Sequence, residues 1–144
     1  MRKLLAALAT FALLQGCTSV PMAHPYEDAQ MKRFETVADK SRIYIYRNET
    51  MGAAIQWMVS IDGRMIGATA KDTYLVAEVT PGEHTISCTG GEFHMLKVTA
   101  EAGKNLYIWQ EMRMGFGNAK TQLHVMSEAE GKAGVMGTKL AGTL

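Results

Sequence analysis

The sequence predicts an all-β protein, an antiparallel β-sandwich of about seven or eight short strands preceded by a short N-terminal helix or tether. Residues 41–144 contain short runs of β-branched and aromatic residues separated by turn sequences with glycine or proline. No long stretch has the apolar spacing of a helix. With 144 residues, 47% hydrophobic and 20% charged, the chain has room for one core.

The first 16 residues have the pattern of a bacterial targeting signal. Arg2 and Lys3 precede an apolar run at 4–14, LLAALATFALL, which is too short to span a bilayer as a helix. The next letters, Leu-Gln-Gly-Cys at 14–17, resemble the lipobox of bacterial lipoproteins, although Gln15 is an unusual occupant. The resemblance implies that Cys17 is acylated and becomes the first residue of the mature chain. The alternative is a plain secreted protein with a chance cysteine.

An acylated Cys17 would attach the protein to a membrane without spanning it. One acyl chain binds a bilayer only marginally, whereas two or three together hold a protein there essentially permanently. In lipoproteins of diderm bacteria, a residue other than Asp after the cysteine, here Thr18, implies sorting to the outer membrane. The leader therefore predicts an envelope protein that faces the periplasm.

Residues 17–40 are expected to form a tether between the anchor and the sandwich domain at 41–144. Pro21 and Pro25 keep the first part extended. A short helix is expected near Glu27–Thr36, where the composition is mixed.

The strands follow at short intervals, divided by turn chemistry. Asp62-Gly63 predicts a tight hairpin, and Pro81-Gly82 predicts a corner. A helical turn is expected at 127–132. The expected strands are 42–47, 56–61, 64–68, 73–79, 83–89, 95–100, 104–112, 121–126 and a weak last one over 134–140.

Several of these segments, taken in order, are similar to a known family. They are Ile43–Tyr46, Ile61–Gly63, Pro81–Ile86, Ala102–Asn105 and Trp109–Glu111. Over roughly 38–140 the chain resembles the bacterial lipoprotein family catalogued as domain of unknown function 2846. It resembles more loosely the small sandwich modules named after their Pro-Glu-Gly-Ala motif. The resemblance implies a periplasm-facing β-sandwich lipoprotein and supplies no catalytic residues.

Composition and motifs argue against several classes of function. The 15 basic and 14 acidic residues leave a net charge of +1, so a nucleic-acid surface is not expected. No serine or threonine is marked as a nucleophile beside a histidine. The glycines at 90–91 and 115–117 lack the spacing of phosphate-binding loops. We expect no enzyme activity and no cofactor.

Metal or small-ligand binding is the alternative function that the sequence leaves open. His84 and Cys88 share one strand face, and His94 follows after a glycine pair. Four residues along a strand are roughly 13 Å apart, too far to share one ion. Cys88 is therefore expected to be a buried packing residue, and the 11 methionines are dispersed as core residues are.

Two strands are apolar on both faces, which a sandwich strand with one wet face should not be. In 42–47 and 104–112, aromatic residues alternate with isoleucine or leucine. The second face could be covered by the leader helix, buried under a loop, or exposed as a patch for an envelope protein. In the third case the contact residues would be Tyr44, Tyr46, Tyr107 and Trp109, and the protein a non-enzymatic interaction or accessory module.

Overall fold

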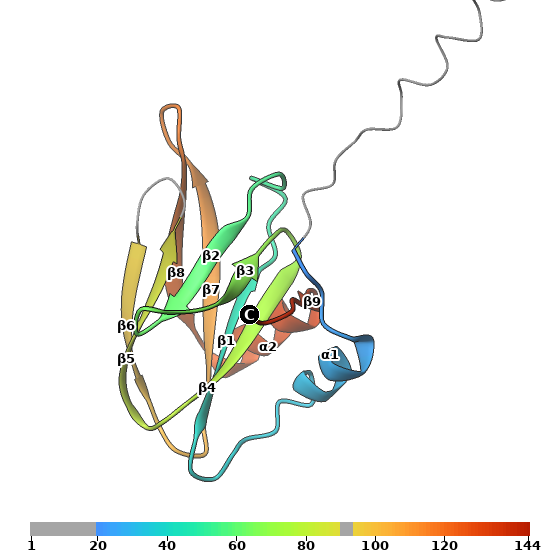
Figure 1. Cartoon of the computed structure of the whole chain (residues 1–144), viewed down its shortest axis with the longest axis vertical. Coiled ribbons are helices and arrows are strands. Elements are labelled where there is room, and N and C mark those ends of the chain that lie inside the picture. The colour runs from blue at the N-terminus through green and yellow to red at the C-terminus, as the bar shows by residue number, and fades with distance from the viewer. Residues whose placement is uncertain (1–19, 90–93) are drawn as a thin grey trace, which may run out of the picture.

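The computed structural model describes residues 20–89 and 94–144, and two β-sheets packed face to face form its centre (Figure 1). Cys17 and the Gly90-Gly91 turn lie outside the described residues. Within the described residues, no helix is both long enough and apolar enough to cross a membrane. The elements are α1 (Pro25–Met31), β1 (Ser41–Arg47), β2 (Trp57–Ile61), β3 (Arg64–Thr69), β4 (Thr73–Val79), β5 (Gly82–Thr89), β6 (His94–Ala100), β7 (Asn105–Met114), β8 (Ala119–Met126), α2 (Glu128–Met136) and β9 (Lys139–Leu140).

The strand order confirms the sandwich predicted from the sequence. One sheet has the order β8-β7-β1-β4-β9, and the other has the order β3-β2-β5-β6. Two pairings, β1 with β7 and β4 with β9, are parallel, so the first sheet is mixed. Between β1 and β7 the chain enters the second sheet twice, through β2–β3 and through β5–β6, and β4 of the first sheet lies between the two visits. The other strand pairings are antiparallel, as expected.

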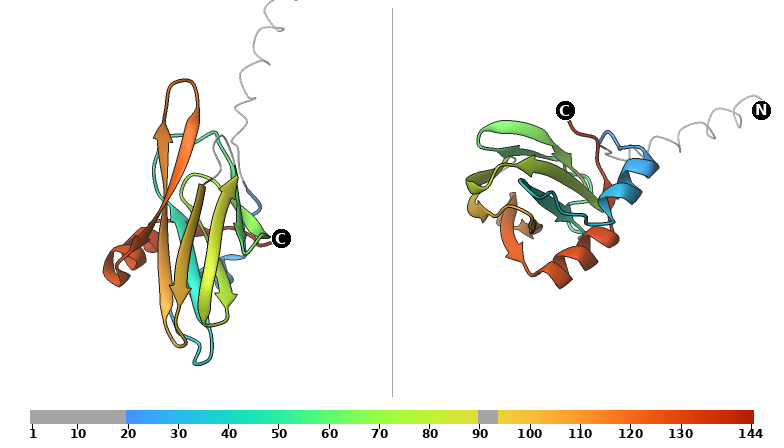
Figure 2. Two further views of the ribbon diagram at one scale, coloured as in Figure 1. Left: turned by 90° about the vertical axis from the view of Figure 1, so that its left-hand side faces the viewer. Right: turned by 90° about the horizontal axis from the view of Figure 1, so that it is seen from below.

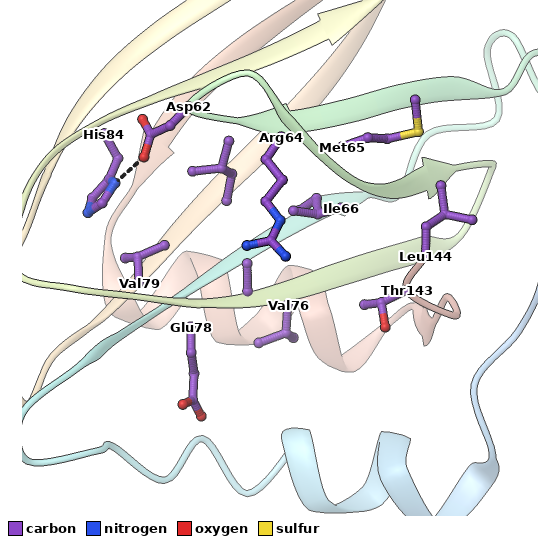
Figure 3. Close-up of a pocket in the computed structure, with 12 residues that line it drawn as sticks. Asp62, Arg64, Met65, Ile66, Val76, Glu78, Val79, His84, Thr143 and Leu144 are labelled. Carbon is purple, nitrogen blue, oxygen red and sulfur yellow. Dashed lines mark hydrogen bonds and ion pairs between the residues drawn. The ribbon is translucent and has the colours of Figure 1, made fainter.

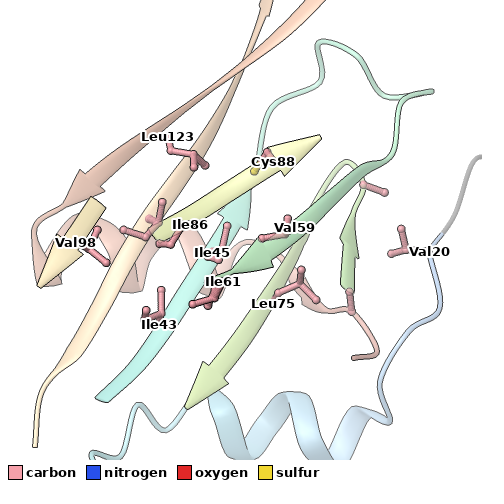
Figure 4. Packing of buried hydrophobic residues seen from close by; sticks show 13 residues of the cluster. Val20, Ile43, Ile45, Val59, Ile61, Leu75, Ile86, Cys88, Val98 and Leu123 are labelled. Carbon is pink, nitrogen blue, oxygen red and sulfur yellow. The ribbon is translucent and has the colours of Figure 1, made fainter. Parts of the chain in front are cut away.

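The main core fills the space between the sheets (Figure 4). Alternate residues of β1, β2 and β5 point into it, as the period-two pattern predicts. Cys88 is fully buried here, which agrees with its expected packing role. The labelled core side chains are Val20, Ile43, Ile45, Val59, Ile61, Leu75, Ile86, Cys88, Val98 and Leu123.

A second apolar cluster lies on the outer face of the five-stranded sheet, beneath α1 and α2. Both helices lie on this side of the sandwich (Figure 2). The tyrosines of β1, β4 and β7 form its sheet side, and Val135 of α2 packs on them. The fold is therefore a three-layer arrangement of sheet, sheet and helices.

The two helices differ from the sequence-based expectation. The predicted strand over 134–140 is wrong for most of its length, because α2 runs to Met136 and only Lys139 and Leu140 form β9. Ser127 starts this helix, since its side chain accepts a hydrogen bond from the Glu130 amide at 3.3 Å. The helix expected at 27–36 is shorter, and Phe34 beyond its end has a left-handed φ of 55°.

Residues 20–40 do not form a free tether. Val20 is 4% exposed and belongs to the main core. The Ala23 amide donates to the Leu140 carbonyl at 3.0 Å, and the Gly142 amide donates to the Pro21 carbonyl at 2.7 Å. These backbone bonds place the segment beside β9, so the folded domain includes residues from Val20 onward.

Candidate functional site

The four aromatic residues predicted as contact residues do not form an exposed surface. Tyr44, Tyr46 and Tyr107 are 0%, 3% and 2% exposed. Trp109 is partly buried, and its ring stacks on His124 with centroids 5.2 Å apart. Cover by helices is therefore the explanation that applies, and the exposed-patch hypothesis is corrected. The covering elements are α1, as one alternative proposed, and α2, which sequence analysis did not foresee in that role.

Two glycines let α2 lie directly on the tyrosine rings. A Cβ atom on Gly131 would lie 2.2 Å from Cβ of Tyr107, and one on Gly134 would lie 2.2 Å from Cε2 of Tyr46. Residues three apart share one helix face, so both glycines face the sheet. The two glycines therefore allow close packing of α2 on the sheet.

The first helix is fastened to the same face by hydroxyl groups. The Tyr44 hydroxyl donates to the Met31 carbonyl at 3.0 Å, and the Tyr74 hydroxyl donates to the Asp28 carbonyl at 3.4 Å. Burial raises the pKa of Tyr44 to about 12, so this hydroxyl stays protonated and remains a donor at physiological pH. The Asp28 carboxylate accepts from the Leu140 amide at 2.9 Å and so ties α1 to β9.

The histidines of the possible metal region are not brought together. In the register of β5 and β6, His84 pairs with Val98 while His94 pairs with Cys88, so the two histidines lie toward opposite ends of this hairpin. The Cys88 thiol points into the core, and burial raises its pKa to about 12. Among the described residues, no group of three histidine, cysteine, aspartate or glutamate side chains could hold a metal ion.

A groove of about 520 Å³ lies between the edges of β3 and β4 (Figure 3). It exists because β3 is the edge strand of one sheet and β4 pairs with β9 only through Thr73 and Tyr74. The two sheets are therefore open to solvent on this side. The lining residues are Ile61, Asp62, Arg64, Met65, Ile66, Val76, Ala77, Glu78, Val79, His84, Thr143 and Leu144.

The groove combines apolar side chains with charged ones at its edges. Ile66 of β3 and Val79 of β4 pack against the main core and contribute apolar surface. The Arg64 side chain extends from β3 toward β4, and Glu78 lies on the β4 side (Figure 3). Glu78 also accepts from the Arg42 guanidinium at 3.0 Å. A groove of this kind can take apolar groups along its length and orient polar groups at its rim.

One end of the groove holds a hydrogen-bonded pair, Asp62 and His84. The Asp62 carboxylate is 2.6 Å from Nδ1 of His84, and the Thr80 carbonyl oxygen is 2.7 Å from Nε2. The pair lies where the Asp62-Gly63 hairpin predicted from the sequence meets β5. Asp62 adopts a left-handed φ of 53°, and its carboxylate also accepts from the Thr85 amide at 2.9 Å.

The two acceptors determine the protonation state of His84. A carboxylate and a carbonyl oxygen can only accept, so both ring nitrogens must donate for both bonds to form, which requires the imidazolium. The hydrogen bond to Asp62, and then the one to Thr80, raise the pKa of His84, and partial burial opposes them less strongly. In this state the ring has no free lone pair and cannot act as a general base. The pair is therefore a structural ion pair at the groove.

Sequence reasoning also missed a buried arginine. Arg47 is fully buried at the end of β1, where its guanidinium donates to the carbonyl oxygens of Ile55, at 2.6 Å, and of Gly52. The Glu49 carboxylate accepts from the Met112 amide at 3.1 Å. Together they close the 48–56 loop over the end of the sandwich. The one sequence signal for its burial was its position at the end of a strand of β-branched and aromatic residues.

Fold and groove together define a class, a β-sandwich domain with one helix-covered sheet and one open edge. The profile of the family described as "Protein of unknown function (DUF2846)" matches residues 37–123. The chain is also 35% identical, over 132 residues, to an uncharacterized protein of Haemophilus influenzae (strain ATCC 51907 / DSM 11121 / KW20 / Rd). The alignment covers 90% of this chain and 78% of that protein. No solved structure matches the chain. The protein belongs to the DUF2846 family, as its segments predicted.

Proposed function

We propose that this protein is a lipid-anchored lipoprotein of the bacterial envelope that works as a non-enzymatic interaction or accessory domain on the periplasmic side of the outer membrane. Cys17 carries the acyl chains. The sandwich is held beside the bilayer, and its open edge is available to other components of the envelope.

The observation that carries this proposal is the short distance in sequence between the lipobox cysteine and the folded core. Val20 is 4% exposed and packs in the main core, three residues after Cys17. A fully extended residue spans at most about 3.6 Å, so the three residues from the cysteine to Val20 can span at most roughly 11 Å. An acyl anchor at this position would hold the whole domain at the membrane surface.

The anchor is tested by substituting the acylated atom. Cys17→Ser removes the thiol, so the full chain should stay uncut and should incorporate no radiolabelled palmitate. The measurement is acyl labelling in cells, with gel mobility to report cleavage. Cys88→Ser is the matched control, because that buried thiol should not be needed for labelling. Label retained in Cys17→Ser would overturn the proposed anchor.

The groove supports a second candidate function, a small-ligand-binding lipoprotein. Its volume of about 520 Å³ and its mixture of apolar and charged lining residues suit a small amphipathic molecule. Binding to the folded state would raise the melting temperature by mass action, which a thermal-shift screen measures. The metal-binding form of this candidate has less support, since His84 and His94 lie far apart along the hairpin.

A further inference from the structure

The end of the molecule that holds Val20 also carries a projecting β-hairpin. Arg47, the last residue of β1, pairs with Thr73, the first residue of β4, so the turn at 70–72 lies at this end. Val20 lines a depression together with that turn. Strand β7 runs parallel to β1, so its last residues and the β7–β8 hairpin point toward the same end (Figure 1).

The β7–β8 hairpin extends beyond the rest of the sandwich. Strand β7 continues for five residues past Trp109, the last residue that pairs with β1, which is roughly 17 Å by strand rise. The Gly115 amide donates to the Asn118 carbonyl at 2.8 Å and closes a tight turn at the tip. Both views that show the hairpin from the side have it projecting alone (Figures 1 and 2).

The tip of this hairpin displays two apolar side chains that the described residues leave largely exposed. Phe116 is as exposed as a residue in a free peptide, at 111%, and Met114 beside it is 62% exposed. A phenylalanine between two glycines at the end of a projecting hairpin packs against nothing that stabilises the fold. Its exposure therefore calls for a partner outside the domain.

Basic and apolar residues accompany this tip at the same end of the molecule. Arg113 and Lys120 are opposite each other across the hairpin stem, and Arg113 also forms an ion pair with Glu111 at 3.1 Å. Met22, 47% exposed, and Lys139 line the depression beside Val20. An apolar tip with basic residues behind it matches the membrane interface, where acyl chains lie below anionic headgroups.

We propose that the β7–β8 hairpin is a second membrane contact, with Phe116 and Met114 inserted into the interface of the bilayer that Cys17 anchors. This inference rests on the proposed lipid anchor, because the anchor brings this end of the domain to the membrane. Two contacts would fix the orientation of the sandwich, and the Asp62-Gly63 turn at the far end of β2 would point away from the bilayer.

A fluorescent probe at position 116 tests the insertion. Cys88 is buried with a raised pKa, and Cys17 is acylated in the mature protein, so an added surface cysteine can be labelled alone. Phe116→Cys and the matched control Met65→Cys, which is 46% exposed beside the far turn, are labelled with an environment-sensitive dye. The acylated full chain is then placed in vesicles of phosphatidylethanolamine and phosphatidylglycerol.

We expect a blue shift of the dye at 116 and a loss of its emission when the vesicles contain a lipid-borne quencher. The dye at 65 should do neither. If the protein floats with the vesicles but both dyes give equal, water-like spectra, the hairpin contact is overturned and the anchor is not. A blue shift at 116 only in native envelope membranes would assign the tip to a protein partner and overturn the proposal. Failure to float would overturn both.

Discussion

At the scale of single residues, His84 couples the groove to pH. Its ring bridges the Asp62 carboxylate and the Thr80 carbonyl, and both bonds need the protonated form. The pKa of His84 is raised above its ordinary value of 6.5, chiefly by Asp62. A group whose pKa rises on folding stabilises the folded state below its unfolded pKa. This contribution is lost as the pH rises through the raised value.

We predict that His84→Asn lowers the melting temperature more below pH 6.5 than in alkaline solution, where the wild-type ring is neutral too. Thermal unfolding of both proteins across this range measures the difference. Asp62→Asn removes the carboxylate, and asparagine tolerates the left-handed backbone at this turn. This variant should therefore lose the same pH-dependent part of the melting temperature as His84→Asn. A difference between wild type and His84→Asn that is constant with pH would contradict the imidazolium assignment.

The stabilisation from the Asp62–His84 ion pair is also lost at acidic pH. The hydrogen bonds from His84 and from the Thr85 amide lower the pKa of Asp62 below its ordinary value of 3.8. Its stabilising contribution is therefore present above 3.8 and is lost as the pH falls through the lowered value. The ion pair is at full strength between the two ordinary values, 3.8 and 6.5.

At the scale of elements, α2 contains glycine where helix propensity alone would favour alanine, because the helix packs closely on the sheet. Alanine is a better helix former than glycine by about 1 kcal/mol. At Gly131 the added methyl group would nevertheless meet the Tyr107 side chain at 2.2 Å, and that ring already packs against the rings of Phe34 and Tyr44. The sheet face, not the helix, therefore selects glycine.

We predict that Gly131→Ala lowers the free energy of unfolding by about 1–3 kcal/mol, the usual cost of overpacking. Urea denaturation measures it. Gly137→Ala at the end of the same helix is the control, because its Cβ would find its nearest atom at an ordinary 3.6 Å. That variant should stay within about 0.5 kcal/mol of wild type. A Gly131→Ala protein more stable than wild type would show that α2 does not lie on the tyrosines as described.

At the scale of the whole molecule, the segment that follows the proposed anchor is part of the fold. Residues 20–23 extend the five-stranded sheet beyond β9, and Val20 fills the core beside Leu75 and Ala141. The described residues nearest the proposed anchor are therefore held to the sandwich by packing.

We predict that Val20→Asp lowers the free energy of unfolding by at least about 2 kcal/mol, because it places a charge in the apolar core. Met22→Asp, at a side chain 47% exposed, should have little effect. Chemical denaturation of the two full-length variants compares them. Equal stability of both variants would mean that Val20 belongs to a free tether after all.

The sequence predicted the parts of this protein that depend on local patterns. The alternation in β2, the Asp62-Gly63 turn and the burial of Cys88 are all present in the structure. The two-sided apolar strands left a covered second face as one of three explanations, and it is the one that the structure has. Alternation and turn chemistry depend only on neighbouring residues, so they can be predicted without knowledge of the rest of the chain.

Other features depended on contacts between residues far apart in sequence. The parallel pairing of β1 with β7, the cover of the tyrosines by α2 and the groove between β3 and β4 bring together segments that share no local signal. The aromatic residues were candidate contacts in the sequence because their alternating pattern is the same whether a helix or water lies above them.

By itself, the sequence determined the sandwich class, the ends of β1 to β8 to within two residues, and the family, and it supplied the anchor hypothesis at Cys17. Only the tertiary structure decided which apolar residues are buried and which are displayed. Phe116 and Tyr107 belong to the same hairpin, yet one is fully exposed and the other is under α2. Burial is a property of the packed whole, since it depends on what other elements place above each residue.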